Sequence, residues 1–366
     1  MLTLAINFIG LIIGILLFVK RPLLENDLDS FSDNKNKISV IIPARNEEKN
    51  LGLLLSDLKN QTYQAFEIIC VDDGSDDFTK EVAQSFGVSL ISINEKPEGW
   101  QGKSWACHIG ADKALGDLIL FLDADVRLKP NALGKLFKTY IKYNCSISVQ
   151  PYHVTNKYYE QLSFFFNAIL IAGNGAGFLI KVKNIGLFGP VILINKQEYQ
   201  SVNGHYAARE SIVDDLTLGR EQNEKGFDYK LFYGDSDISF CMYNSGFDGL
   251  YQGWTKNFAT GAAMTSKTLL LLIIIWVTSC ASIFISLALS IIENNSLQLV
   301  IYLFLYLLVL LELKLIGNRI GNFKGEAILL YPVILLAFIL LLGISVIKKC
   351  FNIKVTWKGR NISLRR

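Results

Sequence analysis

Two patterns of hydrophobic and polar positions alternate along residues 38–150. Apolar residues recur at helical spacing in several stretches, as at Leu51, Leu54 and Leu58. Short apolar runs rich in β-branched residues lie between them and are typical of buried strands. The runs predict strands at 38–42, 66–71, 88–93, 118–122 and 146–150, and the helical stretches predict helices after residue 47 and over 78–86, 104–114 (capped by Ser104) and 131–143. Such alternation indicates an α/β fold with a mostly parallel sheet and helices on both faces.

Longer apolar runs flank this region. Leu2–Val19, Thr268–Ile292 and Ala327–Ile347 contain 18, 25 and 21 residues. About 20 apolar residues cross the ~30 Å hydrocarbon core of a bilayer as a helix. Leu297–Leu311 has only 15 residues before charged residues interrupt it. The sequence therefore predicts a transmembrane anchor at 1–21, a globular domain at 38–260, membrane helices within 268–347 and a basic tail at 348–366.

The placement of basic residues predicts the topology. Lys20 and Arg21 follow the first apolar run, and no Lys or Arg precedes it, which places the globular domain in the cytoplasm of a multi-pass cell-membrane protein. The tail holds seven basic residues, against three in 312–326. We therefore expect a cytoplasmic tail and a 297–311 run that does not fully span. Six cysteines without a Cys-x-x-Cys pair suit a reducing compartment. No feature of the charge pattern calls for a nucleic-acid partner.

Acidic residues follow the predicted strands at the points where these end. Glu47 comes after the first strand, Asp73 after the second, and Asp123 and Asp125 after the fourth. The carboxyl ends of parallel strands share the edge of a sheet where ligands bind. Crowded carboxylates raise one another's pKa unless a cation compensates, and Mg²⁺ or Mn²⁺ takes one or two carboxylates together with substrate phosphates. We therefore predict a metal site at this edge, with neighbouring aspartates acting as helix caps instead: Asp72, Asp76 and Asp77.

Four ordered motifs in residues 38–260 resemble the family 2 glycosyltransferases, which have the GT-A fold. They are Ser39–Glu47, Val71–Asp77, Gly102-Lys103 with Ala106 and Gly110, and Phe121–Val126. The resemblance implies a UDP-sugar donor and a divalent metal ion, Mg²⁺ or Mn²⁺.

By this resemblance, the donor site includes Pro43 and Glu47, with Glu47 on the ribose and Asp73 on the nucleobase, expected to be uracil. Lys103 would lie near the diphosphate, and Asp123 would contact the donor sugar or ribose. Asp125, with Asp123, would hold the metal.

Ser211–Leu216 resembles the acidic pair of the family, in which the second carboxylate is the general base. The resemblance makes Asp215 that base, and a modest base suffices because the proton leaves as the acceptor attacks. Asp214 stands where Glu is common, so its supporting role stays open, and a helix cap is the alternative for the pair. Single displacement implies inversion. His205 and His153 are expected near the acceptor, with a structural role favoured for each.

The resemblance also limits the acceptor. Processive members carry Gln-x-x-Arg-Trp, whereas Gln252–Lys256 has no Arg-Trp pair, which favours transfer of a single hexose. The layout is most similar to members that move glucose from UDP-glucose to the carboxylate of a C30 carotenoid such as 4,4'-diaponeurosporenoate, through Gln150–His153, Trp254–Asn257 and Trp357–Arg360. Arg360 is a candidate to contact the donor diphosphate, with a plain topology signal as the alternative role.

Alternatives remain open at this point. In one alternative, the acceptor in the membrane is another lipid: a polyprenyl phosphate, a diacylglycerol or a ceramide-like molecule. In another, the protein is an inactive membrane scaffold, which the intact set of Asp123, Asp125 and Asp215 disfavours. Tyr158–Phe178 is either a buried helix or a stretch in the membrane interface that admits a lipid.

Overall fold

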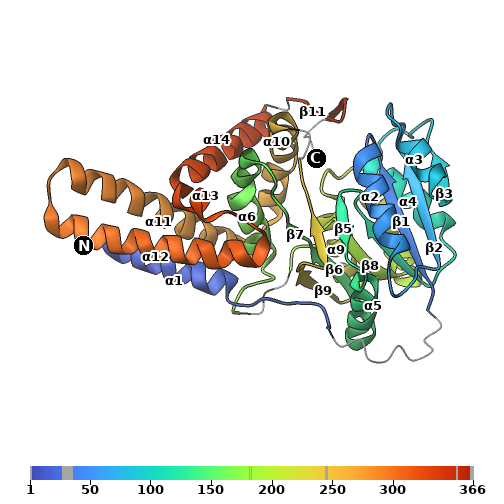
Figure 1. The fold of residues 1–366 in the computed structure, drawn as a ribbon, viewed down its shortest axis with the longest axis horizontal. Helices are drawn as coiled ribbons and strands as arrows, with labels where there is room; N and C mark the ends of the chain where they lie inside the picture. Colours follow the sequence, from blue (N-terminus) through green and yellow to red (C-terminus); the bar gives the residue numbers. More distant parts are fainter. Residues whose placement is uncertain are drawn as a thin grey trace. The chain divides into compact units, whose positions relative to one another are not determined.

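The computed structural model describes residues 2–26, 36–180, 182, 184–243, 246–351 and 353–362, and its elements are drawn in Figure 1. The chain forms two compact units. The α/β unit consists of 22–153, 186–242 and 356–366, and the helical unit consists of 1–21, 154–185 and 243–355. The expected 38–260 domain thus contributes two stretches, 154–185 and 243–260, to the helical unit.

A seven-stranded sheet in the order β3-β2-β1-β4-β8-β6-β9 forms the centre of the α/β unit. Its neighbours pair in parallel except at β8, which is antiparallel to both β4 and β6. The predicted mostly parallel sheet is therefore confirmed. The strands are β1 (Ile38–Ala44), β2 (Glu67–Asp72), β3 (Ser89–Ser92), β4 (Leu118–Leu122), β6 (Ser146–Gln150), β8 (Val191–Asn195) and β9 (Tyr229–Tyr233).

Both faces of this sheet are covered by helices. On one face, Val40 and Ile42 of β1 pack in a core with Leu54 of α2 (Glu48–Lys59). On the other, a Cβ added to Gly110 of α4 (Gly102–Lys113) would lie 2.5 Å from Cγ2 of Ile41. Burial on both faces explains why β1 is continuously apolar. The other helices of this unit are α3 (Thr79–Ser85), α5 (Ala132–Tyr143), α7 (Lys196–Ser201), α8 (Gly204–Ala207) and α9 (Asp214–Glu224).

One predicted helix start is wrong. Helix α4 begins at Gly102, two residues before Ser104, with Gln101 at the N-cap. The Ser104 hydroxyl is buried and has no hydrogen-bond partner among the described residues. A Cβ at residue 102 would lie 2.1 Å from Oδ2 of Asp73, so the chain enters the helix where only glycine fits. The Asp77 carboxylate accepts from the backbone N–H groups of Glu48 and Thr79, the first residues of α2 and α3, each at 3.1 Å, although the N-cap positions are Glu47 and Phe78. The Asp72 carboxylate accepts from the N–H of Ser75, which is not in a helix, so it does not act as the predicted helix cap.

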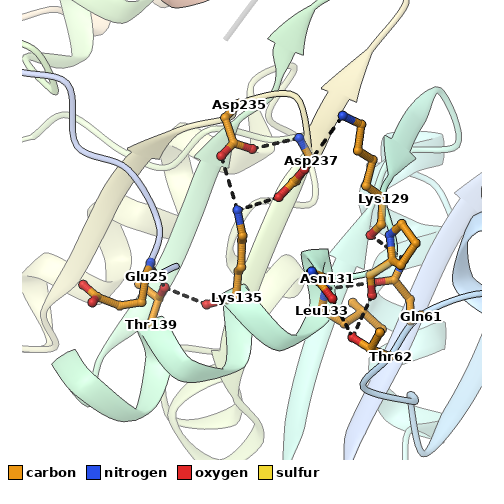
Figure 2. A network of polar contacts seen from close by, with 11 residues as sticks. Glu25, Gln61, Thr62, Lys129, Asn131, Leu133, Lys135, Thr139, Asp235 and Asp237 are labelled. Atoms are coloured by element: carbon orange, nitrogen blue, oxygen red, sulfur yellow. Dashed lines mark hydrogen bonds and ion pairs between the residues drawn. The ribbon is translucent and has the colours of Figure 1, made fainter. Parts of the chain in front are cut away.

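A smaller sheet continues from the end of β4. Its strands are β5 (Val126–Leu128), β10 (Ile238–Phe240) and β7 (Tyr152–His153). Figure 2 shows the polar network beside it, in which Lys135 of α5 pairs with Asp237 at 2.5 Å and Asp235 at 3.5 Å. Because β10 pairs with β5, these ion pairs fix the strand that directly follows Asp125.

The helical unit contains three helices that are long and apolar enough to cross a membrane: α11 (Lys267–Ile292), α12 (Ser296–Ile320) and α14 (Tyr331–Cys350). The expected short 297–311 run is part of the 25-residue α12, which continues through its charged residues. The N-terminal α1 (Leu2–Phe18) is apolar but shorter. The remaining helices are η1 (Tyr158–Ser163), α6 (Phe164–Asn174), α10 (Phe247–Met264) and α13 (Gly325–Leu329).

Small residues let α1 approach α11 closely. A Cβ at Gly10 would lie 2.1 Å from Cβ of Ser279, and one at Gly14 would lie 2.5 Å from Nε1 of Trp276. Ser279 also donates a hydrogen bond of 2.9 Å to the backbone oxygen of Asn7. Glycines spaced four residues apart are a common device for tight packing of membrane helices, where van der Waals contact replaces the hydrophobic drive.

Of the two interpretations of Tyr158–Phe178, the buried helix fits its phenylalanines. Phe164, Phe165 and Phe166 at the start of α6 are at most 2% exposed. Phe166 stacks on Trp254 of α10, with ring centroids 4.1 Å apart. Trp254 therefore belongs to the packing inside the helical unit.

Candidate active site

A small pocket at the carboxyl ends of β1 and β4 brings five of the predicted site residues together. Its lining comes from the strand ends, from α4, from the start of β8 and from α8 and α9. The lining residues are Pro43, Lys103, Cys107, Phe121, Asp123, Gly189, Ile192, His205, Asp214 and Asp215. Segments 170 residues apart in the chain thus meet at the sheet edge where the sequence places a ligand.

Lys103 and Asp123 form the ion pair at the floor of this pocket. The Nζ of Lys103, in the first turn of α4, lies 2.6 Å from Oδ1 of Asp123 at the end of β4. Burial disfavours the charge of Lys103, but the Asp123 and Asp214 carboxylates raise its pKa above the ordinary value. The lysine therefore stays protonated and offers a fixed positive charge to an anionic group.

Asp214 and Asp215 begin α9, where the sequence predicts the acidic pair. Burial, and then the charge of Asp214, raise the pKa of Asp215 to about 7, partly offset by Lys103. Gly189 lies just before β8. A Cβ at this residue would lie 2.9 Å from Oδ2 of Asp215, so the backbone here approaches the carboxylate closely. A carboxyl group with a pKa near neutrality is well matched to accept a proton at physiological pH.

His205 is both buried and part of the pocket wall. Its Nδ1 lies 3.0 Å from the Tyr199 hydroxyl, and its Nε2 lies 3.7 Å from Oδ2 of Asp214. Burial lowers its pKa to about 4, so the ring is neutral near pH 7. The favoured structural role fits this environment, and the ring also limits the space around Asp214. His153 in β7 is buried as well, and burial lowers its pKa to about 3.

Asp125 has the environment of a carboxylate that needs a cation. Burial and the charges of Asp123 and Glu47 raise its pKa to about 7, although Lys358 and Lys103 act in the opposite direction. Within the described ranges, no group of three or more His, Cys, Asp and Glu side chains forms a complete metal cage. Asp123 and Asp125 alone could hold a hard divalent ion only together with substrate phosphates and water as further ligands.

Asp73 presents an open acceptor at the end of β2. It is 5% exposed, and its Oδ1 is buried without a hydrogen-bond partner in the described part of the chain. Its Oδ2 lies 2.5 Å from Nη1 of Arg360. A buried acceptor without a donor is costly. This geometry fits the expected contact with an N–H group of a nucleobase.

The sequence suggested Arg360 of the C-terminal tail as a contact of the donor, but it did not indicate the partners that the tail has in the structure. β11 (Val355–Trp357) and β12 (Arg360–Ile362) form a hairpin. In its turn, Lys358 contacts Oε1 of Glu47, the residue expected at the donor ribose. The basic composition marked this tail, but no local pattern indicated contacts with residues more than 280 positions away. Residues 363–366, including two of the seven basic residues, lie outside the described part.

Comparison with known proteins identifies the family. Residues 39–168 match the glycosyl transferase family 2. The chain is 36% identical to the 4,4'-diaponeurosporenoate glycosyltransferase of Staphylococcus haemolyticus over 98% of its own length and 96% of that protein. This chain belongs to glycosyltransferase family 2. It is accordingly a glycosyltransferase.

A second relative agrees with this assignment. The chain is 31% identical to the 4,4'-diaponeurosporenoate glycosyltransferase of Staphylococcus aureus strain N315, over 96% of its own length and 95% of that protein. Among solved structures, the mannosyltransferase PcManGT from Pyrobaculum calidifontis, in complex with GDP-Man and Mn²⁺, superposes with a TM-score of 0.55 at 14% identity. That superposition covers 95% of this chain and 99% of the other, so the likeness in fold includes nearly the whole of both chains.

Proposed function

We propose that this glycosyltransferase moves one glucose from UDP-glucose to the carboxyl group of a C30 carotenoid acid in the membrane, with inversion at the anomeric carbon. The pocket that joins Lys103, Asp123 and Asp215 supports the reaction type. The near full-length similarity to the staphylococcal 4,4'-diaponeurosporenoate glycosyltransferases supports the acceptor.

The donor would lie along the strand ends. Asp73 offers its open Oδ1 to the base, and Glu47 faces the ribose. Asp125, with Asp123, would hold a Mn²⁺ or Mg²⁺ ion, which supplies positive charge to the diphosphate when bound. Lys103 adds a permanent charge beside Asp123, where the leaving diphosphate gains negative charge. Pro43 lines the wall and closes the pocket beside the sugar.

Asp215 would take the acceptor proton. Repulsion from Asp214 and Asp215 favours the neutral form of an acceptor carboxyl group beside them, and we take this form as the one that reacts. Its oxygen attacks the anomeric carbon while its proton passes to Asp215, and the bond from that carbon to the diphosphate oxygen breaks. A single displacement inverts the configuration and converts an α-linked donor to a β-linked glycosyl ester.

A product analysis tests this function. The purified protein is incubated with UDP-glucose, Mn²⁺ and 4,4'-diaponeurosporenoic acid in mixed micelles, and the lipids are analysed by mass spectrometry and NMR. We expect a mass increase of one hexose and a β-glucosyl ester. Glucosylation of a polyprenyl phosphate, a diacylglycerol or a ceramide instead would replace the acceptor, and absence of transfer to any of them would favour a scaffold.

The proposed membrane topology rests on which segments share the α/β unit. Residues 22–153 and the tail hairpin both belong to it. Both therefore lie on one side of the membrane, and the helices between residues 242 and 356 cross it an even number of times. We place this side in the cytoplasm because Lys20 and Arg21 follow α1. The expectation of a cytoplasmic tail is kept, but it requires that one of three long helices does not span.

We assign the non-spanning role to α14 rather than to the 297–311 run. The chain after α12 turns back along it, since Lys314 donates to the backbone oxygen of Phe323 at 3.5 Å and the Tyr306 hydroxyl donates to that of Leu329 at 2.8 Å. Helix α14 thus begins beside the middle of α11, where the Tyr331 hydroxyl bonds the backbone oxygen of Cys280 at 3.0 Å. A helix that starts at mid-depth and ends next to the tail is re-entrant.

A further inference from the structure

The turn of the tail hairpin has an unusual residue. Lys358 and Gly359 join β11 to β12, with φ of 44° and 78°. Two successive residues with positive φ form a type I′ turn, for which Asn-Gly and Gly-Gly are the favoured sequences. Lysine is uncommon at positive φ and is strained there. A side chain kept at such a position despite the strain points to a role for that side chain.

The contacts of the hairpin place its basic side chains at the expected donor site. Nζ of Lys358 contacts Glu47 and donates to the backbone oxygen of Arg45 at 2.9 Å. Nε of Arg45 donates to the backbone oxygen of Lys358 at 3.2 Å in return. The guanidinium of Arg360 bonds Oδ2 of Asp73 at 2.5 Å and its backbone oxygen at 3.2 Å. Both cations therefore sit on the two carboxylates that we assign to the ribose and the base.

We propose that Lys358 and Arg360 are donor-binding residues that hold the diphosphate of the nucleotide sugar, an inference that rests on the proposed function. A bound nucleoside brings its own hydroxyl and N–H donors to Glu47 and Asp73, which releases the two cations from these acids. The diphosphate arrives at the same time and needs positive partners. A guanidinium can bind two phosphate oxygens at once.

The surroundings of Arg360 suit an anion. A Cβ at Gly102 would lie 2.9 Å from Nη1 of Arg360, and one at Gly74 would lie 3.6 Å from Nη2. Glycine at both positions thus leaves room for the guanidinium over the backbone. Gly102 is also the first residue of the 12-residue α4, and the N–H groups and dipole at a helix N-terminus favour negative charge.

The tail supplies two of the cations around the donor position. Glu47, Asp73 and Asp123 are paired with Lys358, Arg360 and Lys103 in turn. Lys96 also interacts with the charge of Asp73. Loss of either tail cation removes positive charge where the diphosphate must bind.

Other roles of Lys358 and Arg360 predict other changes in nucleotide affinity when these residues are replaced. If the hairpin only blocked the empty site, Lys358 and Arg360 would compete with the donor, and their removal would tighten nucleotide binding. If they only oriented Glu47 and Asp73, their removal would weaken binding of the nucleoside as much as that of its diphosphate. Comparison of UDP with uridine therefore separates the three roles.

The test measures UDP and uridine affinity in the presence of Mn²⁺, with the full-length protein in detergent micelles. The variants are Lys358→Asn, which creates the favoured Asn-Gly turn while it removes the charge, and Arg360→Gln. Lys354→Asn is the matched control, because Lys354 is an exposed basic residue of the same tail outside the hairpin. We expect each hairpin variant to bind UDP about tenfold more weakly, the equivalent of about 1.4 kcal/mol, with no loss of uridine affinity and no change in the control.

Three results would overturn the assignment: tighter UDP binding, an equal loss for uridine, or no change in either variant. Circular dichroism and thermal unfolding of each variant verify that the fold is intact. If the unaltered protein binds neither UDP nor GDP, the proposed function fails and this inference fails with it. If the unaltered protein binds UDP and the variants bind it equally well, only the role of the hairpin is lost.

Discussion

Replacement of Asp215 by Asn separates catalysis from stability at one position. The side chain has the same size, but it cannot accept the acceptor proton. General acid–base catalysis typically contributes ~10²–10⁴-fold, and the electrostatic match of the carboxylate to the transition state adds to this. We therefore expect kcat to fall by at least three orders of magnitude, while the affinity for UDP changes little because Asp73 and Lys103 remain.

The same change should stabilise the protein, in a defined pH window. The pKa of Asp215 is raised from 3.8 to about 7 in the folded protein, so the folded state binds more protons than the unfolded state between these values. Stability of the unaltered protein therefore falls as pH rises from about 4 to about 7. Three pKa units correspond to about 4 kcal/mol as an upper bound, and we expect about 2 kcal/mol because the new amide is also buried beside Asp214.

Thermal unfolding at pH 4 and pH 8 measures this effect. A gain of about 2 kcal/mol corresponds to a melting temperature roughly 4–8 °C higher for a unit of this size, seen at pH 8 and absent at pH 4. Asp112→Asn is the control, since this α4 aspartate has a side chain that is 72% exposed. An identical pH dependence for the Asp215 variant and the unaltered protein would refute the reasoning, and near-normal turnover would place the base elsewhere, with Asp214 next.

Three other predictions follow from the site and the helices. Asp125→Ala should abolish the Mn²⁺ dependence of UDP binding while the fold stays intact, which calorimetry with and without Mn²⁺ measures; UDP affinity that still rises with Mn²⁺ would remove Asp125 as the ligand. Gly14→Leu should force α1 away from Trp276 and lower the melting temperature in detergent, whereas Gly343→Leu, with no atom within 4 Å of its Cβ position, should not; equal effects would contradict the close packing. In a cysteine-free background, a cysteine at Asn294 should react with an impermeant thiol reagent added to whole cells and one at Lys354 should not; labelling at 354 would show that α14 spans.

The sequence predicts β1, β2, β3, β4 and β6 because short runs rich in apolar and β-branched residues are a local property, but it does not predict β9. β4 and β6 have the predicted bounds. Asp123 follows β4 at the edge where strand ends meet, whereas Asp214 and Asp215 reach the same pocket from the start of α9, which only the family resemblance indicated. The predicted start of α4 fails since the fit of Gly102 against Asp73 depends on a contact across the fold.

The extent of the membrane helices also depends on contacts across the fold that the sequence does not show. Glu312 and Lys314 end an apolar run in the sequence, yet α12 continues through them. A Cβ at Gly14 would touch Oε1 of Glu312, so this carboxyl is enclosed by a helix about 300 residues away in the chain, and Lys314 bonds the backbone oxygen of Phe323. Charged residues are tolerated in such segments when they face the interior of a bundle. Only tertiary partners reveal this, as they do for the tail hairpin.

The most direct test of the central claim is the structure of the product formed from α-linked UDP-glucose and 4,4'-diaponeurosporenoic acid. NMR of the purified product reports both the bond and the anomeric configuration. The account predicts a single glucose joined through a β-linked ester to the carotenoid carboxyl group, and no product with the Asp215→Asn variant. An α-linked ester would contradict the single displacement, and glucose on a different lipid would contradict the proposed acceptor.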